Sequence, residues 1–173
     1  GETIEQRVAK FNNQKQILFD ETIDFLSKMA KVDKGKYETT ISQMLQIAGE
    51  ERNSWLSVGA QIYSYDPNAK GPITWEHAVP VKYAAQVILD ALFKPSRFKG
   101  KTFEEVITAL KRNYKQVGFD KATLDAAKLA KHTMPQGWDL FDDSWTARYE
   151  NVKDQLNLSD QKVLLEGNQQ NVF

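Results

Sequence analysis

The stretch Ile73-Thr74-Trp75-Glu76-His77-Ala78-Val79-Pro80 separates two halves of the chain that differ in character. It follows a turn-rich segment at 64–72, which holds two prolines, a glycine, an asparagine and an aspartate, and it precedes an apolar segment at 81–93. A residue before proline is disfavoured in the helical region, and proline suits the first turn of a helix. We therefore expect a short extended segment at 73–75, a helix from Pro80, and a joint between the two halves here.

The N-terminal half carries the pattern of a long helical hairpin. Across 2–31, apolar residues repeat at alternating four- and three-residue steps, and a second apolar stripe lies beside the first. The combined face is too wide for a two-stranded coiled coil and is typical of a helix in a bundle. The sequence Asp-Lys-Gly-Lys at 33–36 ends this helix, and a second helical pattern runs from about 37 to 58. Because the connection is short, we expect the two helices to pack antiparallel.

Shorter helices are predicted in the C-terminal half. Thr102 and Glu105 form a capping-box signature at the start of one helix, which ends near Tyr114. Asp120 is placed to cap another, and the Pro-Gln-Gly at 135–137 ends it. Beyond this point the sequence is rich in aromatic residues without helical periodicity, and its apolar content indicates that it packs against the helices.

Together these patterns predict a mainly α fold with little or no sheet. We expect residues 1–173 to form a single domain with one core. In it, a helical hairpin at 2–63 packs with several shorter helices and an aromatic-rich irregular region at 73–166.

Composition excludes several classes of function. Lysine plus arginine equals aspartate plus glutamate at 23 each, so the formal net charge is zero. This argues against a dedicated nucleic-acid-binding protein. A zero net charge lowers solubility, as expected for a domain that is normally part of an assembly. The absence of cysteine excludes disulfides, zinc–thiolate sites and thiol catalysis. No apolar run approaches the ~20 residues needed to span a bilayer, so we expect a soluble protein without a membrane span. The chain begins at Gly1 rather than methionine, and we interpret it as a processed piece of a longer polypeptide.

Four short segments stand out beside these patterns: Trp75–Pro80, Tyr114–Val117, Met134–Trp138 and Ala147–Tyr149. They resemble parts of the very large virion polyproteins of tailed phages. The resemblance lies within residues 73–150 and implies a processed virion segment or an internal, ejected protein, with no catalytic residues to transfer. We therefore expect a non-catalytic structural or protein-interaction module that needs no cofactor. Its partners would be other protein chains or neighbouring segments of the parent polypeptide.

An alternative function comes from the motif Glu76-His77-x-x-Pro80. It resembles the first motif of HNH-type nucleases, in which the histidine acts as general base and a divalent ion holds the scissile phosphate. The resemblance implies that His77 is the base and Glu76 a metal ligand. His132, the second histidine, also precedes a proline by three positions, and with Asp139 it is a candidate metal ligand. The competing interpretation is that Trp75, Glu76 and His77 stabilise the transition from a loop to a helix.

A cluster of basic residues is the best candidate for a phosphate or nucleic-acid contact. Its members alternate with two phenylalanines, an arrangement that suits single-stranded nucleic acid. The competing interpretation is a solvated loop with the phenylalanines turned inward. The basic residues are Lys94, Arg97, Lys99 and Lys101.

Overall fold

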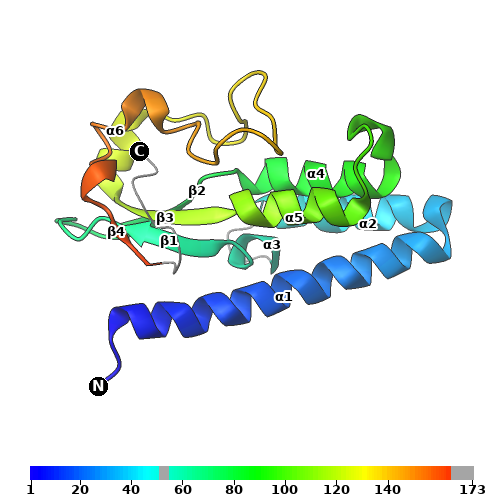
Figure 1. Cartoon of the computed structure of the whole chain (residues 1–173), viewed down its shortest axis with the longest axis horizontal. Helices are drawn as coiled ribbons and strands as arrows, with labels where there is room; N and C mark the ends of the chain where they lie inside the picture. The colour runs from blue at the N-terminus through cyan, green and yellow to red at the C-terminus, as the bar shows by residue number, and fades with distance from the viewer. Residues whose placement is uncertain (51–54, 165–173) are drawn as a thin grey trace.

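The computed structural model describes residues 1–50 and 55–164 and has an α+β fold (Figure 1). The sheet lies at one end and a group of helices at the other, and α1 runs beneath both (Figure 1). The expectation of a mainly α fold with little or no sheet is therefore wrong. The helices are α1 (Ile4–Val32), α2 (Lys34–Glu50), α3 (Trp55–Val58), α4 (Val81–Phe93), α5 (Phe103–Asn113) and α6 (Lys121–Ala127). The strands are β1 (Gln61–Tyr65), β2 (Ile73–His77), β3 (Lys115–Asp120) and β4 (Lys162–Val163).

The sheet has the order β2-β3-β1-β4 and mixes parallel with antiparallel pairs. β3 pairs parallel with β1 and antiparallel with β2, where Trp75 lies opposite Gly118. β4 pairs antiparallel with β1 at the other edge. The segment expected to be extended, 73–75, is confirmed as the start of β2, whereas β1, β3 and β4 were not expected.

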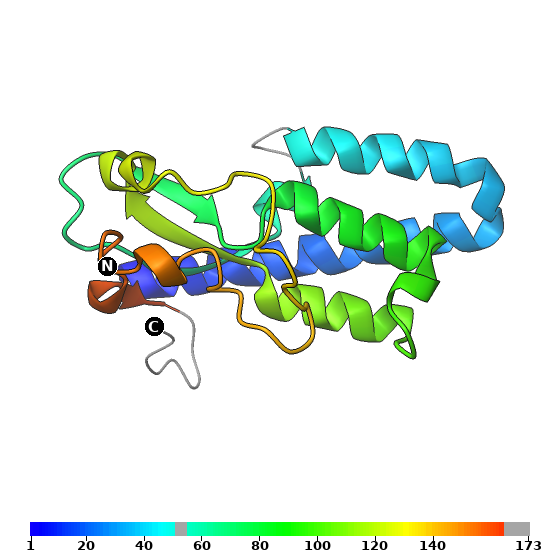
Figure 2. The same cartoon turned by 90° about the horizontal axis from the view of Figure 1, so that it is seen from above.

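The predicted hairpin is confirmed in its first helix and partly wrong in its second. α1 begins at a capping box formed by Thr3 and Gln6, and α2 runs back antiparallel to it (Figure 2). α2 packs mainly against α4 rather than against α1 alone. α2 is described from Lys34 to Glu50 and α3 from Trp55 to Val58, and the residues from Gln61 onward form β1 instead of continuing the hairpin. Residues 51–54 of the predicted helix, and 165–166 of the predicted irregular region, lie outside the described residues.

The predicted helix starts in the second half are confirmed. The Thr102 side chain accepts a hydrogen bond from the Glu105 amide, and the Glu105 side chain accepts one from Thr102. Asp120 accepts from the Thr123 amide at the start of α6. Pro80 immediately precedes α4. Among the helices that the structure describes, none has both the length and the apolar character required to cross a bilayer.

The two faces of the sheet are covered by different parts of the chain. α1 packs on one face, where the Asn12 side chain bonds both backbone groups of Ile62, through Nδ2 to the carbonyl (2.8 Å) and Oδ1 to the amide (2.9 Å). The irregular region covers the other face, where the Trp145 ring lies 4.7 Å from that of Tyr63. The expectation that this region packs inward therefore agrees with the structure, although it packs on a sheet.

Candidate functional site

A groove of about 660 Å³ opens beside β2. All five residues of β2 line it. Phe11 and Lys15 of α1 line it as well, as do the first residues of α4 and the pair Lys131 and His132. The groove therefore brings together His77, His132 and Glu76, which were candidate site residues in the sequence. It also includes Phe11 and Lys15, which were not candidates.

Lys15 is a buried cation at this groove. Its residue is 5% exposed, and Nζ donates hydrogen bonds to the Val58 carbonyl (2.8 Å) and to Gln116 Oε1 (3.0 Å). The ammonium also lies 4.7 Å from the centre of the Phe11 ring. Burial disfavours the charged form and lowers the pKa of Lys15 to about 8. The sequence offered one signal for this residue, a charged side chain at an otherwise apolar position of the α1 pattern.

His77 is held as a neutral imidazole. Its Nε2 lies 2.9 Å from the Ser57 carbonyl oxygen, and because a carbonyl can only accept, Nε2 carries the proton. Burial is the largest cause that lowers the pKa of His77, to about 4, and the positive charges of Lys15 and Arg148 act in the same direction. The hydrogen bond to Ser57 opposes this shift. The histidine is therefore a weak base that fastens β2 to the end of α3.

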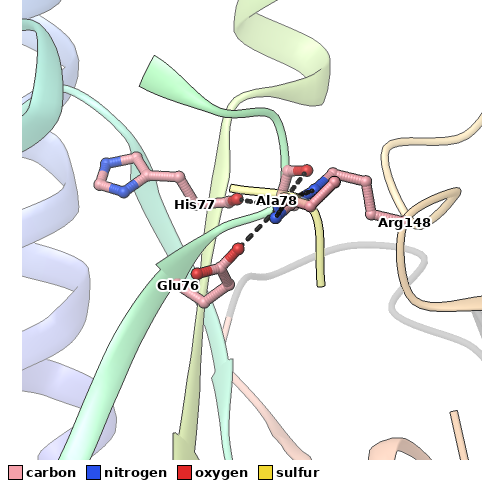
Figure 3. A network of polar contacts seen from close by, with 5 residues as sticks. Glu76, His77, Ala78 and Arg148 are labelled. Atoms are coloured by element: carbon pink, nitrogen blue, oxygen red, sulfur yellow. Dashed lines mark hydrogen bonds and ion pairs between the residues drawn. The ribbon is translucent and has the colours of Figure 1, made fainter. Parts of the chain in front are cut away.

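Glu76 is engaged on the other side of β2 by Arg148, whose side chain is only 4% exposed (Figure 3). Arg148 Nη1 donates to Glu76 Oε1 (2.6 Å) and to the carbonyls of His77 (2.8 Å) and Ala78 (3.3 Å). Its Nε and Nη2 both donate to the Ala130 carbonyl. Figure 3 shows the Glu76 carboxylate turned toward Arg148 and the His77 ring turned away toward α1. The two residues of the nuclease-like motif therefore face different surroundings.

The other candidate metal ligands do not join these two. His132 lines the same groove as His77, but Asp139 lies in a turn where its Oδ1 accepts from the amides of Phe141 (2.7 Å) and Asp142 (3.2 Å). Across 1–50 and 55–164, no three histidine, aspartate or glutamate side chains are grouped as metal ligands. The divalent-metal site stays a prediction.

Comparison of the chain with protein-family models, curated protein sequences and solved structures found no match. Function is therefore inferred from the geometry of the groove and of the remaining surface.

The basic cluster lies in the connection between α4 and α5. Its two phenylalanines, Phe93 and Phe98, are buried, as in the interpretation of a solvated loop with apolar residues turned inward. Arg97 Nη1 forms an ion pair with Asp90 Oδ2 (2.6 Å), and Lys101 Nζ lies 4.9 Å from the centre of the Phe141 ring. Lys94 and Lys99 are exposed. Nucleic-acid binding by this cluster stays a prediction.

The outer face of α1 is the second notable surface. The inner of its two apolar stripes, which contains Phe19, Ile23, Leu26 and Ala30, is buried in the core. Beside it, four exposed apolar residues lie seven positions apart, which places them on one side of the helix, and they are here called the outer stripe. Its members are Phe11, Leu18, Phe25 and Val32, with exposures of 47%, 37%, 53% and 76%. The described residues bury the inner stripe and leave these four side chains exposed, whereas Met29, which the sequence pattern places beside them, packs against the core.

Proposed function

We propose that this protein is a non-catalytic structural or interaction module that binds a helix of another protein chain along the outer stripe of α1. The observation that carries the proposal is the exposure of four large apolar side chains at heptad spacing. From Phe11 to Val32 they extend along about 32 Å of helix at 1.5 Å per residue. Fully burying one such side chain stabilises by about 1.5–3 kcal/mol. A stripe of this kind is suited to a second helix lying alongside.

Charges beside the outer stripe specify what the partner helix should carry. Moving along α1, the flank is first basic, then acidic, then basic again. Flanking charges select the partner and its direction in paired helices. We therefore propose a partner whose flank runs acidic, basic, acidic when aligned with α1. The flanking residues are Arg7 and Lys10, then Glu21 and Asp24, then Lys28 and Lys31. Among them, Lys10 forms an exposed ion pair with Glu2 and Lys28 one with Asp24, each at 2.8 Å.

The position of the four phage-like segments supports a structural role. Arg148 contacts Glu76, His77 and Ala78, β2 pairs with β3, and the Trp138 ring lies 5.6 Å from that of Tyr83 at the start of α4. Three of the segments thus meet around one joint, and Trp138 of the fourth contacts the helix that follows Pro80. We propose further that the chain is a processed segment of a phage virion or internal protein, a proposal that rests on the sequence resemblance of these segments alone.

Measurement of size in solution tests the proposed function. Sedimentation of the protein alone and with neighbouring segments of its parent polypeptide should reveal a complex. Phe25→Asp should abolish that complex, because it places a charge in the buried seam, while leaving the fold intact, since Phe25 is exposed. A chain that remains a monomer with every neighbouring segment would overturn the proposal.

A further inference from the structure

Strand β2 is an edge of the sheet with one row of backbone groups directed away from it. The Ala78 amide donates to the Lys115 carbonyl (2.9 Å), and the Pro72 carbonyl accepts from Lys121 (3.2 Å). Backbone groups alternate in direction along a strand, so the even-numbered residues of β2 bond to β3. The odd-numbered residues, Ile73, Trp75 and His77, therefore direct their amides and carbonyls outward. Of these groups, the His77 carbonyl is taken by Arg148.

The groove runs along this edge. Side chains of successive strand residues point to opposite faces, so a surface that follows one face contacts only every second residue. The groove is lined by all five residues of β2, which places it beside the edge itself. Ile73 and Trp75 are exposed there, and Phe11 of α1 contributes a third exposed apolar side chain. Within 1–50 and 55–164, the edge thus offers backbone groups without a partner next to apolar contact surface.

The charges around the groove favour an acidic occupant. Three lysines line it: Lys15, Lys82 and Lys131. The carboxylates of Glu50 and Glu76 line it as well. The charge of Glu76 is neutralised by Arg148, so only the Glu50 carboxylate offsets the three lysines within the described lining. Among the described residues, no carboxylate lies within ion-pair distance of Lys15 Nζ. The described lining is therefore predominantly basic.

We infer that β2 is a strand-addition site, which pairs with an extended, acidic segment of a partner protein. In this mode of recognition the main chain supplies affinity, and alternate side chains supply specificity. Five strand residues span about 17 Å, so the site holds a segment of about five residues. The segment would place apolar side chains against Trp75 and acidic ones toward the lysines. The groove shares only Phe11 with the outer stripe. The inference therefore does not depend on the proposed helix partner.

Selection from a displayed library of random ten-residue peptides tests the inference. We expect the enriched peptides to carry an excess of aspartate and glutamate with alternating apolar residues. Synthetic copies should shift the amide NMR signals of Ile73, Trp75 and His77 on binding. Failure to enrich any peptide, or enrichment of basic peptides, would overturn the inference.

Backbone pairing is separated from simple contact by matched variants. Ile73→Pro removes an outward amide, whereas Ile73→Ala keeps it, so the first should weaken binding about tenfold more than the second. N-methylation of alternate peptide amides should abolish binding in one register and spare it in the other, a result that does not depend on how well the proline variant folds. Equal effects in both registers would contradict strand addition. Lys131→Glu should weaken binding, and Lys153→Glu, an exposed charge away from the groove, should not.

Discussion

The guanidinium of Arg148 lies 2.6 Å from the carboxylate of Glu76, although the two residues are 72 positions apart in the chain. The same side chain donates to the carbonyls of His77, Ala78 and Ala130. One nearly buried cation thus ties the irregular C-terminal region to the end of β2 and to the segment after α6. Residues 76–78 thus connect the two halves of the chain, as expected for the segment 73–80, and Arg148 from the C-terminal half stabilises this connection.

Removing this cation should destabilise the fold strongly. We expect Arg148→Ala to lower the free energy of unfolding by about 3–5 kcal/mol, because it leaves the Glu76 charge and several carbonyls without their donor. Urea denaturation measures the change. Arg112 also donates to a carbonyl, that of Phe141, but in an exposed setting, so Arg112→Ala should cost less than about 1 kcal/mol. Equal effects of the two substitutions would contradict a stabilising role of Arg148 between the C-terminal region and β2.

Acid should weaken the fold through His77. The pKa of His77 is about 4 in the folded protein and ordinarily 6.5, so between these values the unfolded chain binds a proton that the folded chain does not. The stabilisation is complete above pH 6.5 and is lost as the pH falls toward 4, up to about 3 kcal/mol in total. Urea denaturation at pH 7 and pH 4.5 should show a smaller loss for His77→Gln, which stays neutral throughout. Identical losses would contradict the neutral, partly buried imidazole.

Gly118 should resist even a methyl group. A Cβ at this position would lie 2.9 Å from Ile73 Cγ2, 2.9 Å from Trp75 Cζ3 and 3.0 Å from Tyr65 Cβ. We expect Gly118→Ala to destabilise by about 1–3 kcal/mol through overpacking and to shift the fluorescence of Trp75. Gly35→Ala serves as control, because its Cβ would meet only Asp33 Oδ1 at 3.7 Å within the α2 helix. A Gly118→Ala protein as stable as Gly35→Ala would show that Trp75 does not pack across β3.

The nuclease alternative is tested by direct assay. We expect no cleavage of DNA or RNA with Mg²⁺ or Mn²⁺, because His77 is a weak base whose Nε2 proton is donated to Ser57, and Glu76 is engaged by Arg148. Cleavage by the wild-type protein that His77→Ala abolishes would instead establish the nuclease and contradict the non-catalytic account. Cleavage that His77→Ala leaves unchanged would indicate a contaminant.

The helices were predictable because their signals are local. Capping residues such as Thr102 and Asp120 stand next to the segments they start, and the α1 pattern repeats within the helix. The sheet was not predictable in the same way. Residues 116–119 of β3 are all buried, and a strand covered on both faces shows no apolar–polar alternation. β1 has the same character, with Ile62, Tyr63 and Ser64 buried, so its residues were assigned to the hairpin and the following loop.

The candidate site was only half visible in the sequence for a related reason. The motif at 76–80 is recognisable in the sequence because its residues are adjacent. Arg148 and Lys15 were not recognised as members, because their partners Glu76 and Gln116 lie 72 and 101 positions away. Such long-range pairs leave no local pattern. The only sequence signal for the Lys15–Gln116 pair is the presence of a lysine at an otherwise apolar position of the α1 pattern.

Position-specific photocrosslinking along α1 tests the central claim most directly. A photoreactive phenylalanine analogue placed at Phe25, on the outer stripe, should capture one partner protein in the cells or particles that contain this chain. Its crosslinked residues on that partner should be spaced three or four positions apart, as on a helix. The same analogue at Asn13, an exposed position about 120° around α1 from Phe25, should capture nothing. Equal capture from both positions, or capture from neither, would contradict the outer stripe as a docking face.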